Sequence, residues 1–180
     1  MSVDGTVAVF GSSQTEPGSK EWADAFRAGK LLAGAGYAVI TGGYGGTMEA
    51  VSSGAAEAGG HVIGVTAPVL FPGRFGANEF VAEVIEASSL ANRIDIMMQR
   101  STATLALPGS IGTAAELLIS WNTNHIMRRA GARPRVSVAV GAGWKALARA
   151  LVDAGAFEGD VYWVETVDEG VEQILTESVD

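Results

Sequence analysis

The chain has 180 residues and no Cys, and 48% of it is hydrophobic, which suits one globular domain and excludes disulfides and thiolate metal sites. Its 12 basic and 20 acidic residues give a net charge of −8, which argues against a broad nucleic-acid surface but leaves room for a small phosphorylated ligand. Met1–Thr6 lacks a basic leader region and no apolar run reaches the ~18 residues of a membrane span, so we expect a cytoplasmic protein.

Short apolar runs alternate with longer helical patterns along the chain. In chain order the pattern predicts strand Thr6–Phe10, helix Ser19–Ala35, strand Ala38–Thr41, helix Thr47–Ala58, strand His61–Val65, an extended Phe80–Ile85, helix Ser88–Arg100, strand Ala103–Leu107, helix Thr113–Arg128, strand Arg135–Val140, helix Trp144–Ala154, strand Val161–Val164 and helix Val167–Leu175. This alternation predicts an α/β fold, a three-layer doubly wound parallel sheet with helices on both faces. No linker is visible, so residues 1–180 are expected to form a single domain.

Three loops follow strands and should open at one edge of this sheet, where ligands of such folds bind. They provide the candidate ligand- and phosphate-binding residues Gly11, Ser12, Ser13, Gly42, Gly43, Gly46, Thr47, Pro108, Gly109, Ser110, Gly112 and Thr113.

The segment Pro108–Glu116 carries the strongest chemistry. Gly109 and Gly112 permit a turn that exposes successive N–H groups, and the following helix N-terminus adds partial positive charge. This combination predicts a phosphate site, to which the Thr113 hydroxyl adds a donor. An alternative is structural, because Thr113 and Glu116 have the spacing of a capping box.

The other two glycine loops are open to simpler interpretations. Gly42–Gly46 has the same strand–turn–helix setting but also suits a tight turn, and Ser12 and Ser13 suit a turn cap. No Lys follows the glycines as in a P-loop, and no GxGxxG follows the first strand, so binding of NAD is disfavoured.

Arg93 is the basic residue that we single out. Its apolar neighbours indicate a largely buried helix, where an arginine needs a carboxylate or phosphate partner. The alternative is a surface arginine that pairs with Asp95 or Glu86. Arg74, in the long loop after the third strand, is either solvated or covers a ligand, and Tyr44 either packs or stacks on a base.

Metal and nucleophile chemistry find no support in the sequence. His61 and His125 show no metal-ligand spacing with carboxylates, and no catalytic triad is recognisable. We therefore expect neither a metal nor a cofactor.

Together these segments resemble the LOG (Lonely Guy) family, whose members are sometimes mislabelled as lysine decarboxylases. The most specific element is the family's PGGxGTxxE motif, here Pro108–Glu116, while Gly42–Val51 is similar to its first glycine loop and Gly59–Val65 is also typical. The family's catalytic arginine precedes the motif at a spacing that falls on Arg93. The resemblance implies a Rossmann-like nucleotide-binding domain that forms a homodimer or a higher homo-oligomer.

The resemblance also implies an activity. LOG enzymes of cytokinin biosynthesis are phosphoribohydrolases that cleave the N-glycosidic bond of a nucleoside 5′-monophosphate, such as AMP or a cytokinin riboside monophosphate, to free base and ribose 5-phosphate. Carried over, Glu116 and Arg93 become the catalytic residues. Glu116 would stabilise positive charge on the ribose or activate water, while Arg93 orients Glu116 or the ligand.

Three departures favour a second hypothesis. Ser110 replaces the second Gly of the motif, and the first glycine loop is one residue short. Ile94 stands where the cytokinin-activating LOG enzymes carry Lys after the catalytic arginine. These features resemble a sister branch that includes molybdenum-cofactor carriers, so the alternative is a non-catalytic carrier of a nucleotide or of that cofactor. A third idea, lysine decarboxylation on pyridoxal phosphate, would need Lys20, Lys30 or Lys145, none of which has a supporting motif.

Overall fold

The computed structural model describes residues 5–74, 76–157 and 159–177, so the two ends of the expected domain lie outside the described residues. Within this part the elements in chain order are β1 (Thr6–Phe10), α1 (Lys20–Gly34), β2 (Ala38–Thr41), α2 (Thr47–Glu57), β3 (Val62–Thr66), β4 (Glu83–Glu86), α3 (Leu90–Gln99), β5 (Ala103–Ala106), α4 (Ile111–Arg129), β6 (Val136–Val140), α5 (Ala142–Asp153), β7 (Tyr162–Val164) and α6 (Val167–Glu177).

The strands pair in parallel in the spatial order β4-β3-β2-β1-β5-β6-β7. Val7 of β1 lies between Val39 of β2 and Ala103 of β5. The chain builds the sheet outward from β1 in one direction and then from β5 in the other, so the strand order reverses between β1 and β5. The predicted doubly wound α/β fold is confirmed.

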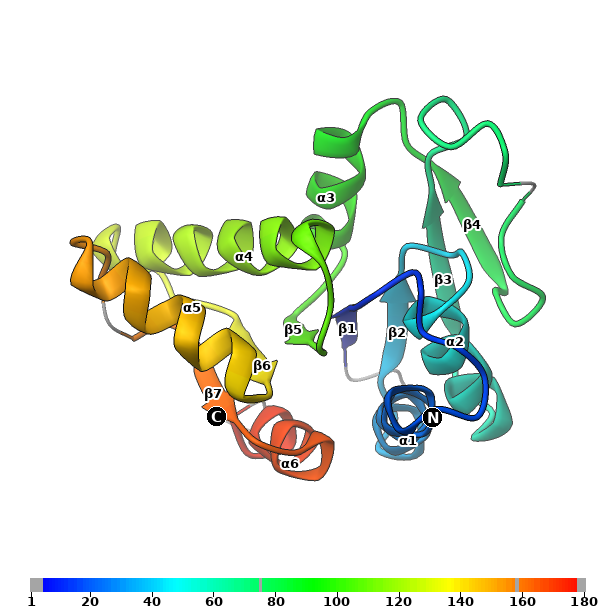
Figure 1. Cartoon of the computed structure of the whole chain (residues 1–180), viewed down its shortest axis with the longest axis horizontal. Coiled ribbons are helices and arrows are strands. Elements are labelled where there is room, and N and C mark those ends of the chain that lie inside the picture. Colours follow the sequence, from blue (N-terminus) through cyan, green and yellow to red (C-terminus); the bar gives the residue numbers. More distant parts are fainter. Residues whose placement is uncertain (1–4, 75, 158, 178–180) are drawn as a thin grey trace.

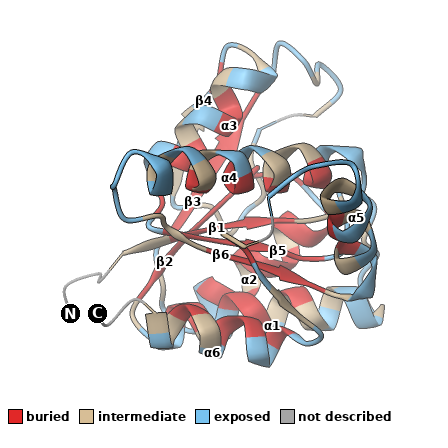
Figure 2. Ribbon diagram, turned by 90° about the vertical axis from the view of Figure 1, so that its left-hand side faces the viewer, coloured by how far each residue is buried: buried red, intermediate tan, exposed pale blue. Residues whose placement is uncertain are grey.

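Helices cover both faces of the sheet, as Figures 1 and 2 show. On one face Leu32 of α1, Val51 of α2 and Ile174 of α6 pack against the strands. On the other face Met97 of α3 and Leu117 of α4 belong to a second apolar cluster, with α5 beside them. Burial on both faces explains why the central strands are continuously apolar rather than alternating.

The edge strand β4 is shorter than the predicted extended segment Phe80–Ile85. The Val81 amide donates to the Asn78 carbonyl at 3.1 Å, and this turn delays the start of the strand to Glu83. Exposure alternates along β4, as expected for a strand at the edge of the sheet.

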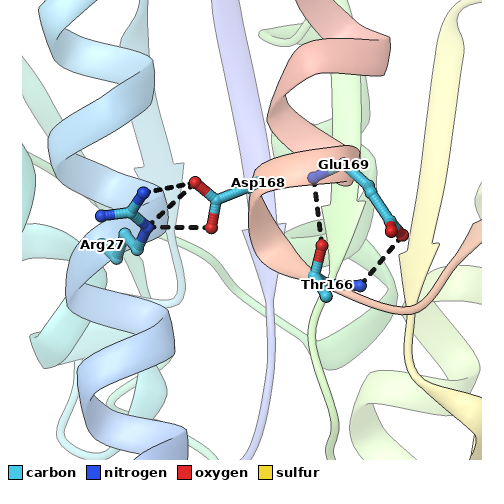
Figure 3. A network of polar contacts seen from close by, with 4 residues as sticks. All are labelled: Arg27, Thr166, Asp168 and Glu169. Carbon is cyan, nitrogen blue, oxygen red and sulfur yellow. Dashed lines mark hydrogen bonds and ion pairs between the residues drawn. The ribbon is translucent and has the colours of Figure 1, made fainter.

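Polar contacts stabilise the first turn of helix α6, as Figure 3 shows in detail. Arg27 of α1 binds the Asp168 carboxylate through two of its nitrogens. The Glu169 amide donates to the Thr166 hydroxyl at 3.3 Å, while the Thr166 amide donates back to the Glu169 carboxylate at 3.3 Å. Thr166 and Glu169 therefore form a true capping box. No helix in the described part of the chain combines the length and the apolar character that crossing a bilayer requires.

Candidate functional site

A cavity of about 230 Å³ lies beside the point of strand reversal, where the loops after β1, β2 and β5 meet. We call it the strand-edge cavity. Eight of the fourteen residues proposed from the sequence line it: Gly11, Ser13, Gly42, Arg93, Ser110, Gly112, Thr113 and Glu116. The rest of its lining is Val9, Phe10, Met48, Phe71, Arg74, Leu90, Ile94 and Ala115. The eight proposed residues thus come together from three loops and from α3 and α4, at the edge where such folds bind ligands.

The N-terminus of α4 opens into this cavity. The helix begins at Ile111, two residues before the predicted start, and Ser110 is its N-cap without a side-chain hydrogen bond. Among the described residues no acceptor takes the amides of Ile111, Gly112 and Thr113, since the first helical bond runs from the Ala114 amide to the Ser110 carbonyl. Free amides at a helix start, together with its partial positive charge, suit a bound anion.

The capping-box interpretation of Thr113 and Glu116 is wrong. With Ser110 as the N-cap, Thr113 is the third residue of α4 and Glu116 the sixth, too far along to reach back to the helix start. The same Thr-x-x-Glu spacing does cap α6, at Thr166 and Glu169. The carboxylate of Glu116 is therefore not used in capping, and it lines the cavity instead.

The electrostatics of Glu116 are unusual for a carboxylic acid. Removal from water raises the pKa of the Glu116 carboxyl to about 7, and the positive charge of Arg93 opposes part of that rise. No ion pair or hydrogen bond of Glu116 forms within the described residues. A carboxyl with a pKa near neutrality is suited to accept and return a proton at physiological pH.

Arg93 is buried, with 6% of its surface exposed. Its Nε donates to the Val65 carbonyl and its Nη2 to the Gly42 carbonyl, both at 2.7 Å. Burial lowers the pKa of Arg93, and the Glu116 charge raises it. The alternative of a surface arginine paired with Asp95 or Glu86 is wrong, because Asp95 binds Gln99 and neither carboxylate pairs with Arg93 in the described chain.

Two of the site glycines are explained by close approach of protein atoms. A Cβ on Gly42 would lie 1.7 Å from Arg93 Nη2, and one on Gly109 would lie 2.2 Å from Thr113 Oγ1. Gly112 differs, because a Cβ there would meet no atom within 4 Å beyond its chain neighbours and the nearby backbone of α4 itself. Packing within the protein therefore does not require glycine at position 112. A ligand that approaches the helix amides closely would require it.

The start of α2, in contrast, is closed by the protein itself. The Thr47 amide donates to the Ser12 carbonyl at 2.8 Å, and the Thr47 hydroxyl bonds the Thr15 hydroxyl at 2.8 Å. Gly46, with a φ of 72°, lies against the backbone of Ser12 and Ser13. The strand-edge cavity is therefore not lined by Gly43, Gly46 or Thr47. This agrees with the alternative interpretation of the loop as a tight turn.

The remaining proposed residues line a neighbouring hollow. Ser12, Pro108 and Gly109 border a space of about 470 Å³ that shares Ser110 with the strand-edge cavity. The turn before α4 therefore borders two adjoining spaces, and Ser110 lines both of them.

Comparison with known proteins identifies the family. The sequence profile of the SLOG cluster4 family matches residues 4–140. The chain belongs to this family. The resemblance to LOG proteins that the motifs indicated is thereby confirmed.

Among its relatives, this SLOG protein is 34% identical to a cytokinin riboside 5′-monophosphate phosphoribohydrolase of Mycobacterium tuberculosis over 68% of the chain and 65% of the relative. It is 38% identical to an enzyme of the same name from Arabidopsis thaliana over 65% of the chain and 55% of the relative. The chain thus spans less than two thirds of the length of these relatives.

Solved structures share the fold. A molybdenum cofactor binding protein of Rippkaea orientalis superposes with a TM-score of 0.74 at 21% identity, over 97% of this chain and 96% of that one. The molybdenum cofactor carrier protein of Chlamydomonas reinhardtii gives a TM-score of 0.74 at 22% identity, over 97% and 98%.

Several lining residues of this SLOG protein were not singled out from the sequence. Met48, Phe71 and Leu90 carry no polar chemistry, and Phe71 lies in a loop without periodicity. Tyr44, which the sequence left undecided between packing and stacking on a base, does not line this cavity; it is buried, and its hydroxyl accepts a hydrogen bond from the Ala67 amide at 2.8 Å. Long-range contacts of this kind have no local sequence signal.

The three lysines lie outside the strand-edge cavity. Lys20, Lys30 and Lys145 pair with the carboxylates of Asp24, Glu57 and Glu165, respectively. Nothing here supports a pyridoxal Schiff base in this cavity. Within the described residues, no group of three or more His, Asp or Glu side chains could hold a metal ion.

Proposed function

We propose that this SLOG protein is a phosphoribohydrolase that converts a nucleoside 5′-monophosphate, such as AMP or a cytokinin riboside monophosphate, to free base and ribose 5-phosphate. The observation that carries the proposal is a carboxyl of pKa about 7, Glu116, in the same cavity as the open N-terminus of α4. The relatives from Mycobacterium tuberculosis and Arabidopsis thaliana, which are named as cytokinin riboside 5′-monophosphate phosphoribohydrolases, support it.

In this mechanism the α4 amides hold the 5′-phosphate, with the Thr113 hydroxyl as a further donor. One helical turn onward, Glu116 faces the ribose. As the bond between C1′ and the base nitrogen breaks, its electron pair leaves with the base and positive charge develops on the sugar. Ionised Glu116 stabilises this charge and takes a proton from the attacking water, whose oxygen bonds to C1′. The proton then passes to the departing base.

Arg93 has a positioning role in this scheme. Its bonds to the Val65 and Gly42 carbonyls fix the guanidinium, and its charge favours the ionised form of Glu116. A charge held in place before the reaction needs no reorganisation during it.

The decisive experiment is mass spectrometry of the protein incubated with AMP and cytokinin riboside monophosphates. Base and ribose 5-phosphate should form in equal amounts with the wild type, and Glu116→Gln should lower the rate by at least 10²-fold. Undiminished release by Glu116→Gln would remove Glu116 from the mechanism. Glu172→Gln, on the exposed side of α6, is the matched control and should retain wild-type turnover.

A non-catalytic carrier is the second candidate. Ile94 lines the strand-edge cavity at the position where activating LOG enzymes are expected to carry Lys, so the cavity has one cation fewer. The named ligand of the two structural neighbours is the molybdenum cofactor, a phosphorylated molecule that the α4 amides suit equally. Binding of nucleotide or cofactor without any base release would favour this candidate.

A further inference from the structure

Arg74 is a second arginine in the strand-edge cavity, and it comes from the loop that joins β3 to β4. Hydrogen bonds hold this loop against the glycine loop after β2 on both sides of Arg74. The Ala67 amide donates to the Tyr44 hydroxyl at 2.8 Å, and the Asn78 amide donates to the Gly43 carbonyl at 2.7 Å. The sequence left Arg74 undecided between solvent and ligand, whereas these anchors place it on the cavity wall.

The guanidinium groups of Arg74 and Arg93 share one pair of aromatic rings. Arg74 Cζ lies 5.0 Å from the Tyr44 ring centroid and 4.7 Å from that of Phe71, and Arg93 Cζ lies 5.5 and 5.9 Å from the same two centroids. The rings meet edge to face, with centroids 5.6 Å apart. A guanidinium held over a ring face keeps N–H groups for another partner.

Neither arginine forms an ion pair with a carboxylate in the described chain, although the Glu116 carboxyl lines the same cavity. The side chain of Arg74 forms no hydrogen bond or ion pair there, and Arg93 donates to carbonyl oxygens and to the Met48 sulfur. Burial is the main cause that lowers the pKa of Arg93; the Glu116 charge opposes this, and the charge of Arg74 adds a smaller lowering. Two like charges that repel each other at one cavity, in a chain of net charge −8, favour a bound anion.

We propose that Arg74 is a specificity-determining residue that binds the phosphate of the ligand together with the α4 N-terminus, and thereby selects nucleoside monophosphates over unphosphorylated nucleosides. The inference rests on the proposed function, because it assigns Arg74 to the same ligand. A phosphate near Arg74 relieves its repulsion with Arg93, and a guanidinium edge matches two phosphate oxygens at once.

A purely structural role for Arg74 is the competing explanation. Arg74 also lines a neighbouring hollow of about 370 Å³, which contains Glu49 and Glu79. If its function were to balance these carboxylates, its loss would weaken the fold and affect all ligands alike.

The test is titration calorimetry with AMP and adenosine, carried out in the Glu116→Gln background so that no turnover interferes. Adding Arg74→Gln should weaken AMP binding about tenfold, which corresponds to about 1.4 kcal/mol, and change adenosine binding less than twofold. Arg74→Lys, which keeps the charge, should recover part of the loss. Arg149→Gln, an exposed arginine on α5, is the matched control and should change neither affinity.

Equal weakening of AMP and adenosine, or no weakening of AMP, would overturn the assignment of Arg74. So would a parent protein that binds AMP no more tightly than adenosine. Failure of the hydrolase proposal is a separate result, because absent base release from the wild type leaves the ratio of AMP to adenosine affinity measurable.

Discussion

Replacing Glu116 by Gln should change how the stability of the protein depends on pH. Burial raises the pKa of the Glu116 carboxyl from 4.5 to about 7 in the folded chain, against the opposing charge of Arg93. The folded state therefore binds this proton more tightly than the unfolded state. Its stabilisation is complete below pH 4.5 and is lost as the pH rises to about 7. At about 1.36 kcal/mol per pKa unit the loss is at most ~3.5 kcal/mol, and partial exposure of Glu116 reduces it to roughly 1–3 kcal/mol.

The assay is urea unfolding of the wild type and the Gln variant from pH 4 to 9. Between pH 4.5 and 7.5 the difference in free energy of unfolding should move in favour of Glu116→Gln by roughly 1–3 kcal/mol, then stay level. Glu172→Gln should follow the wild type throughout. A difference that is constant across this range, or that moves in favour of the wild type, would refute the idea that the fold holds the Glu116 carboxyl away from water.

Three further substitutions probe the site and the assembly. Gly42→Ala should displace the Arg93 guanidinium and lower the free energy of unfolding, measured in urea, by about 1–3 kcal/mol. It should also weaken AMP binding at least tenfold. Unchanged AMP binding would show that Arg93 does not act on the ligand. Gly112→Ala should raise the free energy of unfolding by about 0.5–1 kcal/mol, since its Cβ meets no atom outside the local backbone of α4, yet weaken AMP binding in calorimetry. Wild-type affinity for AMP would exclude ligand contact at this turn. In sedimentation experiments we expect a dimer that Ile119→Lys dissociates, because α4 exposes Ile111, Ile119 and Ile126; a monomeric wild type would contradict this.

Element type and order could be predicted from the sequence because each strand is a short apolar run between turn residues. The bounds Thr6–Phe10 and Ala38–Thr41 agree with the structure. The start of α4 could not be predicted, because a Thr-x-x-Glu pattern has the same local meaning at Thr113 as at Thr166. Only the tertiary structure shows that the pattern at Thr113 faces a cavity, whereas the pattern at Thr166 caps a helix.

The chemistry of the candidate site was only partly visible in the sequence. Apolar neighbours predicted that Arg93 is buried. Its acceptors, the carbonyls of Val65 in β3 and of Gly42 in the loop after β2, are 28 and 51 residues away. Arg74 and Phe71 lie in a loop without periodicity, so only the fold brings them to the cavity. Local patterns thus pointed to the turn at Pro108–Thr113, while non-local packing supplied the rest of the cavity wall.

The central claim is that the open amides at the start of α4 hold the phosphate of a nucleotide beside Glu116. A crystal structure of the Glu116→Gln variant with AMP tests it most directly. The phosphate oxygens should lie within about 3 Å of the Gly112 and Thr113 amide nitrogens, with the ribose C1′ next to residue 116. Nucleotide bound elsewhere on the protein, with these amides facing only water, would contradict the claim.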